Sequence, residues 1–160
     1  MDEAAARAAF ATALATYRQE FGTFFLARLL DLDIRYPDLP GDTCVITFAP
    51  KDFLFNPQGR VHGGVIATVM DISMGHLVDH VSGPAVTLEM KTQYLKAAGT
   101  GTLVCTGRFL RRGRRISHTA AELVDAEGDL VAFATATWRS LDRDAPDPSG
   151  SGSPSPTSAG

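Results

Sequence analysis

One stretch organises the chain, and it reads NPQGRVHGGVIATVMD from Asn56 to Asp71. Its first four residues are a strong turn signal, because Pro and Gly punctuate turns and Asn bonds its own backbone. Gly63 and Gly64 then open an apolar run that continues to about His80. The stretch predicts a polar loop, a helix start and a long helix that contains one acid.

The predicted helix is apolar on almost every side until Ser73 and His76. A helix that is apolar nearly all round is buried on most sides. The chain has 160 residues, which suits one domain. In a domain of this size, a β-sheet must wrap around the helix.

Segments with strand-like patterns are expected to supply that sheet, at 32–36, 43–50, 85–96, 102–112, 116–125 and 130–141. In the second segment, Cys44, Ile46 and Phe48 share one face. The last four segments follow one another through short turns and are expected to be antiparallel. The predicted fold class is α+β, with a curved antiparallel sheet around one long central helix.

The segment 85–96 alternates regularly, which predicts two distinct faces. One face carries Val86, Leu88, Met90 and Tyr94, and the other carries Thr87, Glu89, Lys91 and Gln93. This pattern places Thr87 and Met90 on opposite sides of the sheet.

Three regions are predicted along the chain. Residues 1–21 form an amphipathic helix, with Phe10, Leu14 and Tyr17 at helical spacing and Gly22 as its break. Residues 22–143 form the main domain. Residues 144–160 are mostly Pro, Ser and Gly, and they cannot bury enough surface to offset the entropy of ordering. This tail is predicted to be disordered.

Composition and charge argue against several classes of protein. The net charge of −3 predicts no general attraction to nucleic acid. No apolar run reaches the roughly 20 residues that span a membrane, and Met1-Asp2-Glu3 is acidic where a signal peptide would be basic. A cytoplasmic location is therefore expected. Cys44 and Cys105 are expected to be small packing residues.

Asp71 is the first candidate for chemistry. It lies in the second or third turn of the predicted helix, with Ala67, Met74 and Gly75 near it on the same face. A carboxylate among packing atoms is expensive unless it is paired. Two explanations stay open. Either Asp71 has a function, or it has a structural environment, which is a locally solvated helix face or an ion pair with a basic group such as Lys91.

Gly63 and Gly64 are the second candidate, because they open the helix. The first N–H groups of a helix have no intrahelical partner, and the helix dipole is positive there. Such an end can polarise a carbonyl, and glycine lets a ligand approach the backbone closely. An ordinary helix start that contains glycine fits the same residues.

The spacing of these candidates has a structural consequence. Gly63 and Asp71 lie eight positions apart, about 12 Å along a helix that rises 1.5 Å per residue. The Asp71 side chain cannot then reach a carbonyl held about 3 Å from the Gly63 amide. If both groups act on one atom, they belong to different chains, which predicts a two-fold homodimer.

Asn56 is the third candidate and precedes Asp71 by fifteen residues. A carboxamide in this loop can orient a water or a substrate carbonyl. A turn residue before Pro57 explains Asn56 equally well, and Gln58 is a neighbouring carboxamide with the same chemistry.

The pattern Asn56…Gly59-x-Val61-His62-Gly63-Gly64-x(6)-Asp71 closely resembles the hotdog-fold acyl-CoA thioesterases of the phenylacetate-pathway (PaaI) type. The run from Val86 to Lys96 also resembles the family's strand after the helix. The resemblance covers roughly residues 22–141. It implies hydrolysis of an acyl-CoA thioester at a site across a dimer interface, without a metal or organic cofactor.

The resemblance also implies roles for individual residues. Asp71 is the nucleophile or general base, and the Gly63 amide polarises the thioester carbonyl. The Asn56 carboxamide positions the water or the carbonyl, and the Thr87 hydroxyl assists. Some relatives carry a hydroxyl one turn after the acid. This chain has Gly75 there, so that role is either missing or falls to Thr87.

Further residues are expected to bind the substrate. By the same resemblance, His62 is expected to fix the loop before the glycines. Arginines cluster around one predicted hairpin, where they match the phosphates of coenzyme A or form a solvated turn. The predicted binding residues are His62, Gly64, Gln58, Arg111, Arg112 and Arg114. His76 and His80 are interpreted as a solvated helix end rather than a metal site.

Two other functions fit the sequence less well. A hotdog hydratase or dehydratase usually pairs a catalytic histidine with an acid, and His62 is present. A non-catalytic acyl-CoA-binding module would not need Asp71. The aromatic residues favour an apolar acyl group without selecting an aryl or a medium-chain one. The choice between a homodimer and a homotetramer, as a dimer of dimers, stays open.

Overall fold

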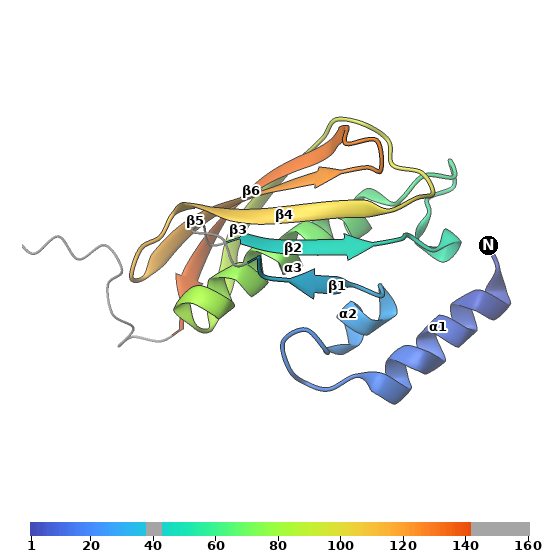
Figure 1. The fold of residues 1–160 in the computed structure, drawn as a ribbon, viewed down its shortest axis with the longest axis horizontal. Coiled ribbons are helices and arrows are strands. Elements are labelled where there is room, and N and C mark those ends of the chain that lie inside the picture. The colour runs from blue at the N-terminus through green and yellow to red at the C-terminus, as the bar shows by residue number, and fades with distance from the viewer. Residues whose placement is uncertain (38–42, 142–160) are drawn as a thin grey trace, which may run out of the picture.

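The computed structural model describes residues 1–37 and 43–141. Its elements, in chain order, are α1 (Glu3–Thr16), α2 (Phe25–Leu29), β1 (Asp33–Arg35), β2 (Thr43–Phe48), the 3-10 turn η1 (Asp52–Leu54), α3 (Gly63–Ser82), β3 (Ala85–Tyr94), β4 (Leu103–Arg111), β5 (Ile116–Val124) and β6 (Leu130–Ser140). The strands form one antiparallel sheet that curves around α3 (Figure 1). The predicted α+β architecture is confirmed.

The order of strands in the sheet differs from the order in the chain. The sheet runs β1-β2-β4-β5-β6-β3, so β3 pairs with β6 and not with β4. The expectation of short turns between all four last strands is therefore wrong for the step from β3 to β4. The pairing of β3 with β6 makes β3 an edge strand of ten residues.

Helix α3 begins where the glycine pair predicted, because His62 caps it. The His62 backbone is extended (φ −62°, ψ 133°), and its Nδ1 accepts a hydrogen bond from the Gly64 amide at 2.9 Å. The helix runs to Ser82 and stops at Gly83, whose φ of 79° lies in the left-handed region that glycine tolerates.

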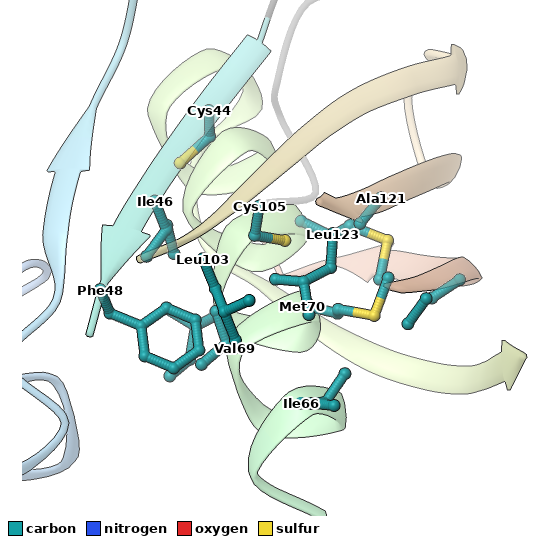
Figure 2. Close-up of a cluster of buried hydrophobic side chains, with 14 of the residues drawn as sticks. Cys44, Ile46, Phe48, Ile66, Val69, Met70, Leu103, Cys105, Ala121 and Leu123 are labelled. Atoms are coloured by element: carbon teal, nitrogen blue, oxygen red, sulfur yellow. The ribbon is translucent and has the colours of Figure 1, made fainter. Parts of the chain in front are cut away.

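The core lies between α3 and the face of the sheet that covers it. Cys44, Ile46 and Phe48 of β2 all point into this core, as their alternation predicted. They pack in one cluster with Val69 and Met70 of α3 (Figure 2). Burying large apolar side chains contributes about 1.5–3 kcal/mol each, so this cluster fixes α3 against the sheet. Both cysteines of the chain are free and buried, as expected of packing residues.

Strand β3 departs from regular alternation. Its register with β6 shifts between Thr87 and Glu89, so Leu88 is an extra residue in a β-bulge. Thr87 and Met90 consequently line the same cavity against α3. The prediction that these two residues lie on opposite faces is wrong, because an alternating pattern carries no mark of an inserted residue.

The N-terminal helix is shorter than predicted. Helix α1 ends at Thr16 because Tyr17 is extended (φ −67°, ψ 151°), and the Arg18 amide then donates to the Thr23 carbonyl in a compact loop. Pro40 and Gly41 also predict a turn. That turn and the predicted tail at 144–160 lie outside the described residues. Within the described ranges, no helix is long and apolar enough to cross a bilayer.

Candidate active site

The first turn of α3 leaves one backbone amide unbonded. The Gly64 amide donates to His62 Nδ1, and the Val65 and Ile66 amides donate to the His62 carbonyl oxygen at 2.9 and 3.3 Å. The Gly63 amide has no hydrogen bond to any residue that the structure describes. Because the His62 carbonyl and the Gly63 amide belong to one peptide group, donors on that carbonyl polarise the free N–H.

His62 is therefore a capping residue, as the sequence predicted for the loop before the glycines. Its Nδ1 is an acceptor in the cap, so this nitrogen is not free to act as a base. The Gly64 amide is occupied by the same bond. A substrate contact by His62 or Gly64 stays a prediction. It would have to use atoms other than His62 Nδ1 and the Gly64 amide, because these two already bond each other.

Asp71 faces strand β3. The Thr87 hydroxyl donates a hydrogen bond to Asp71 Oδ1 at 3.0 Å. Burial raises the pKa of the Asp71 carboxyl above its ordinary value, and the bond from Thr87 lowers it in part. Within the described residues Asp71 has no ion pair with Lys91 or another base. The basic partner that the sequence allowed for Asp71 is therefore not observed, and its partner is the Thr87 hydroxyl.

A cavity of about 950 Å³ lies over Asp71 and Thr87. Aromatic side chains form part of its wall, among them Phe21, Phe24 and Trp138. Pockets that bind small molecules have volumes of about 300–1,000 Å³ and mostly apolar walls. The acid therefore lies at the wall of a cavity with the size and lining of a small-molecule site.

Gly75 shows why this chain has no hydroxyl one turn after the acid. A Cβ atom at this position would lie 2.9 Å from the ring of Trp138. That ring is fixed, because its Nε1 donates to Thr119 Oγ1 at 2.8 Å in the core. A side chain at Gly75 does not fit, and Thr87 is the hydroxyl available to Asp71.

A second cavity, of about 460 Å³, lies at the start of α3 beside Gly63. Asn56 and Gln58 line it, together with Tyr94 from the end of β3. The Tyr94 hydroxyl donates to the Gly63 carbonyl oxygen at 2.9 Å. The alternating pattern of β3 predicted which face of the sheet Tyr94 lies on, but it predicted no role for Tyr94 at the site. The contact between Tyr94 and Gly63 joins residues thirty-one positions apart, which a local pattern does not reveal.

Asn56 holds the loop that leads into this cavity. Its Oδ1 accepts hydrogen bonds from the Gln58 and Arg60 amides at 3.0 and 3.1 Å. Its backbone amide donates to the Arg60 carbonyl at 2.7 Å. The turn role left open by the sequence is therefore observed. A role in orienting water or substrate stays a prediction, and it rests on the carboxamide nitrogen.

The two candidate groups lie in different cavities of one chain. The larger cavity contains Asp71 and the smaller one contains Gly63, and no residue lines both. Eight helical positions separate the two residues, about 12 Å along the axis. Each chain therefore presents two candidate half-sites, one with an acid and one with a backbone donor.

His76 does not belong to a solvated helix end. It is buried at 3 % exposure, and its Nδ1 is 2.8 Å from the Tyr36 hydroxyl. Burial lowers its pKa. His80 stacks on Tyr36 with ring centroids 4.0 Å apart. The sequence interpretation was wrong for His76 because Tyr36, forty positions earlier in the chain, covers this face. The described residues contain no cluster of side chains arranged to hold a metal.

The arginine hairpin between β4 and β5 lies at the other end of α3. Arg112 donates to the Val81 carbonyl at 3.2 Å and lies 5.7 Å from the Phe109 ring centroid. Arg111 and Arg114 are exposed. Val81 follows Asp71 by ten positions, about 15 Å, and Gly63 by eighteen, about 27 Å. The hairpin is therefore nearer the acid half-site of its own chain.

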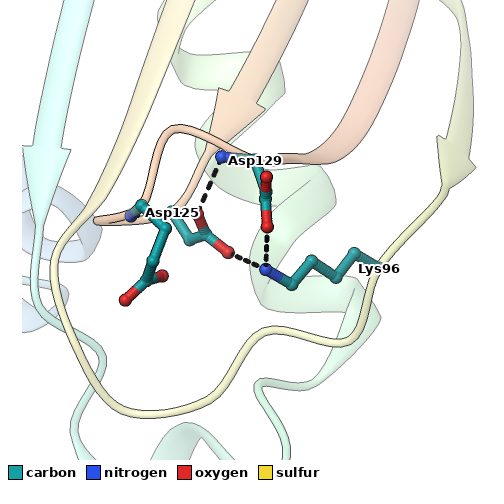
Figure 3. Close-up of polar contacts among 4 residues, drawn as sticks. Lys96, Asp125 and Asp129 are labelled. Carbon is teal, nitrogen blue, oxygen red and sulfur yellow. Dashed lines mark hydrogen bonds and ion pairs between the residues drawn. The ribbon is translucent and has the colours of Figure 1, made fainter.

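Lys96 secures the chain just after β3. Its Nζ lies 2.5 Å from Asp125 Oδ2 and 2.6 Å from Asp129 Oδ2 (Figure 3). Hydrogen bonds to these carboxylates raise the pKa of Lys96, and the bond from Lys96 lowers the pKa of Asp125. Lys96 lines the cavity beside Gly63, but its ammonium group is occupied. It ties the β5–β6 turn to the end of β3.

Comparison with known proteins places the chain in a family. Residues 58–132 match the family model of the thioesterase superfamily. A structure from Ralstonia eutropha JMP134, provisionally named a thioesterase and phenylacetic acid degradation-related protein, is 31 % identical over 72 % of this chain and 89 % of its own, with a TM-score of 0.67. The protein smu.793 of Streptococcus mutans UA159, solved with bound acetyl-CoA, is 28 % identical over 68 % of this chain and 86 % of its own, with a TM-score of 0.63.

A protein of Saccharolobus solfataricus that is provisionally named an esterase is 29 % identical over 109 residues, which are 67 % of this chain and 78 % of its own. With these relatives and the sheet around α3, the chain belongs to the hotdog-fold thioesterase superfamily. Its phenylacetate-pathway relative confirms the resemblance that the loop, glycine pair and acid predicted.

Proposed function

We propose that the protein hydrolyses an acyl-CoA thioester to a carboxylic acid and free coenzyme A. The observation that carries the proposal is the pair of half-sites on α3: an unbonded Gly63 amide, and a half-buried Asp71 that accepts a hydrogen bond from Thr87. Acetyl-CoA bound to smu.793 supports the choice of coenzyme A as the leaving group. The expected cytoplasmic location is part of the same proposal.

The reaction needs both half-sites at one carbonyl, so we propose a homodimer. Strand β3 supports it, because edge strands are templates for pairing with another chain. On this edge Val86 and Leu88 are 37 % and 53 % exposed. A two-fold axis near the middle of the Gly63–Asp71 segment would bring each Gly63 amide beside the Asp71 of the other chain. Whether two such dimers associate further does not affect the chemistry.

In the proposed reaction, the Gly63 amide of one chain donates to the thioester oxygen and stabilises the developing oxyanion. Asp71 of the other chain acts by one of two routes. As a nucleophile, it attacks the carbonyl carbon and expels coenzyme A thiolate, and water then hydrolyses the mixed anhydride. As a general base, it takes a proton from an attacking water and later returns the proton to the departing thiolate.

The hydration alternative has less support at this site. A hydratase needs a free imidazole as its base, and His62 uses Nδ1 to cap α3. The non-catalytic alternative leaves unexplained why a half-buried carboxylate lies at the cavity wall, since burial disfavours its charged form. Hydrolysis uses both features.

The test is thiol release from aryl, medium-chain and long-chain acyl-CoAs by the wild type and Asp71→Asn. We expect kcat to fall about 10²- to 10⁴-fold in the variant, the usual contribution of a positioned base. Asp79→Asn is the matched control, because burial also raises its pKa on the same helix but it lines neither cavity. Full activity in Asp71→Asn would contradict the proposal. Solvent oxygen-18 appearing in Asp71 after one turnover would identify the nucleophilic route.

The Asp71→Asn variant should also change the thermal stability of the protein. Burial raises the folded-state pKa of Asp71 above its unfolded value, so the folded chain binds this proton more tightly. By linkage, the extra stability that comes from binding this proton is lost as the pH rises through the folded-state pKa of Asp71. At neutral pH the ionised carboxylate therefore costs stability. We expect Asp71→Asn to raise the melting temperature at pH 7 while it lowers kcat.

A further inference from the structure

Tyr94 contacts the residue that carries the unbonded amide. Its hydroxyl donates to the Gly63 carbonyl oxygen at 2.9 Å. Its ring lies against the same residue, since a Cβ atom built on Gly63 would be 3.3 Å from Tyr94 Cζ. Tyr94 is half exposed and lines the cavity beside Gly63. The Tyr94 side chain thus holds the start of α3 by a hydrogen bond and also lines the cavity beside it.

The β-bulge in β3 makes this contact possible. Thr87 and Tyr94 lie seven positions apart, and residues at an odd spacing face opposite sides of a regular strand. The register shift between Thr87 and Glu89 adds one residue, so Tyr94 reaches α3 on the same side as Thr87. One strand therefore contacts α3 at its amide half-site and at its acid half-site.

We propose that Tyr94 is a positioning residue for the Gly63 amide, a role that rests on the proposed hydrolysis. Glycine at a helix end has wide conformational freedom. A hydrogen bond to the Gly63 carbonyl and a ring against its Cα restrict the peptide groups on both sides of that residue. Stabilisation of an oxyanion depends on a donor that is already oriented, and small displacements are costly. Tyr94 acts through Gly63 and does not itself bond the thioester oxygen.

The first measurement is steady-state kinetics of Tyr94→Phe, which keeps the ring and removes the hydroxyl. We expect kcat to fall about tenfold while KM changes less than about twofold, because the lost orientation matters most in the transition state. Tyr17→Phe is the matched control, since that hydroxyl has no hydrogen bond within the described residues and lines neither cavity. It should retain wild-type kcat.

The second measurement separates positioning from a purely structural role. A ketone analogue of the substrate, with CH₂ in place of sulfur and a ¹³C-labelled carbonyl, is bound and its infrared stretch recorded. The wild type and Tyr17→Phe should lower the carbonyl frequency through the Gly63 donor, and Tyr94→Phe should lower it less. A reduced melting temperature with unchanged kcat and carbonyl frequency would overturn the proposal, as would an effect confined to KM.

Failure of the proposed function gives a different result. If the wild type releases no thiol from any acyl-CoA, hydrolysis itself is wrong. If the wild type is active and Tyr94→Phe matches it in kcat and carbonyl frequency, hydrolysis stands and the role of Tyr94 is wrong.

Discussion

The start of α3 and its middle offer opposite kinds of chemistry on one helix. At the start, a polar loop and the His62 cap leave the Gly63 backbone amide unbonded. Eight residues later, apolar walls surround the Asp71 side chain and disfavour its charge, and Thr87 is its polar partner. One half-site supplies a donor without an acid, and the other supplies an acid without a donor. This difference is the reason for the proposal that two chains combine to form each site.

The largest expected effect comes from separating the two half-sites genetically. Gly63→Pro removes the amide and should preserve the helix, because proline suits the first helical position and His62 already has the extended backbone that precedes proline. The exposed Tyr94 ring, 3.3 Å from a Cβ at this position, must shift slightly to admit the proline. Gly63→Pro and Asp71→Asn should each be nearly inactive alone. Co-expressed, they should recover about a quarter of wild-type activity, since half of the dimers carry one intact site.

This complementation decides whether the half-sites meet across chains. Recovery in the mixed sample, with tagged heterodimers isolated at about half of wild-type activity, supports a shared site. If the mixture stays as inactive as either parent, each site is built within one chain and the dimer proposal fails. Co-expression of Asp71→Asn with Asp71→Ala is the control, and it should stay inactive.

The acid half-site is examined alone by Thr87→Val. Removing the hydroxyl removes the bond that stabilises the Asp71 carboxylate, so the Asp71 pKa rises further. We expect kcat to fall about tenfold, the scale of losing a hydrogen bond to a charged group, and the acid limb of the pH–kcat profile to move to higher pH. Thr92→Val is the control on the same strand, because its hydroxyl has no hydrogen bond within the described residues. An acid limb that moves to lower pH would contradict the assignment.

The smallest effect is expected at the arginine hairpin. Within one chain, this hairpin lies nearer to the acid half-site than to the amide half-site. Neutralising Arg111, Arg114 and Arg115 to Gln removes exposed charges and leaves the Arg112 bond to Val81 intact. We expect KM for an acyl-CoA to rise about three- to tenfold, and less so at high salt.

Two controls show whether that effect belongs to the nucleotide. An acyl thioester of N-acetylcysteamine, which lacks the nucleotide, should show the same KM in the wild type and the variant. Neutralising three exposed arginines elsewhere, at Arg7, Arg28 and Arg35, should leave the KM for acyl-CoA unchanged. An unchanged KM in the hairpin variant would show that the hairpin is a solvated turn.

The sequence predicted those features that depend on neighbouring residues. Alternation placed Cys44, Ile46 and Phe48 in the core, and the structure confirms it. The glycine pair marked the start of α3, and the spacing of Gly63 and Asp71 separated the two half-sites. Turn chemistry, helical rise and apolar periodicity are local properties, so they survive in any fold that the chain adopts.

Long-range contacts could not be predicted in this way. The pairing of β3 with β6, the burial of His76 beneath Tyr36 and the contact of Tyr94 with Gly63 all join distant segments. The bulge at Leu88 reversed the predicted face of Thr87 relative to Met90. A period of two residues sets faces only within an uninterrupted strand, and the partner strand decides where the interruption falls.

By itself, the sequence determined a long buried helix, a polar loop before it, and two candidate groups spaced too far apart to serve one atom. Only the tertiary structure decided what holds each group. The cap by His62 leaves the Gly63 amide unbonded, and β3 supplies Thr87 to Asp71 and Tyr94 to Gly63. The reason is physical: spacing along a helix is fixed by covalent geometry and hydrogen bonds, whereas the partners of its side chains depend on which strand the folded sheet brings alongside.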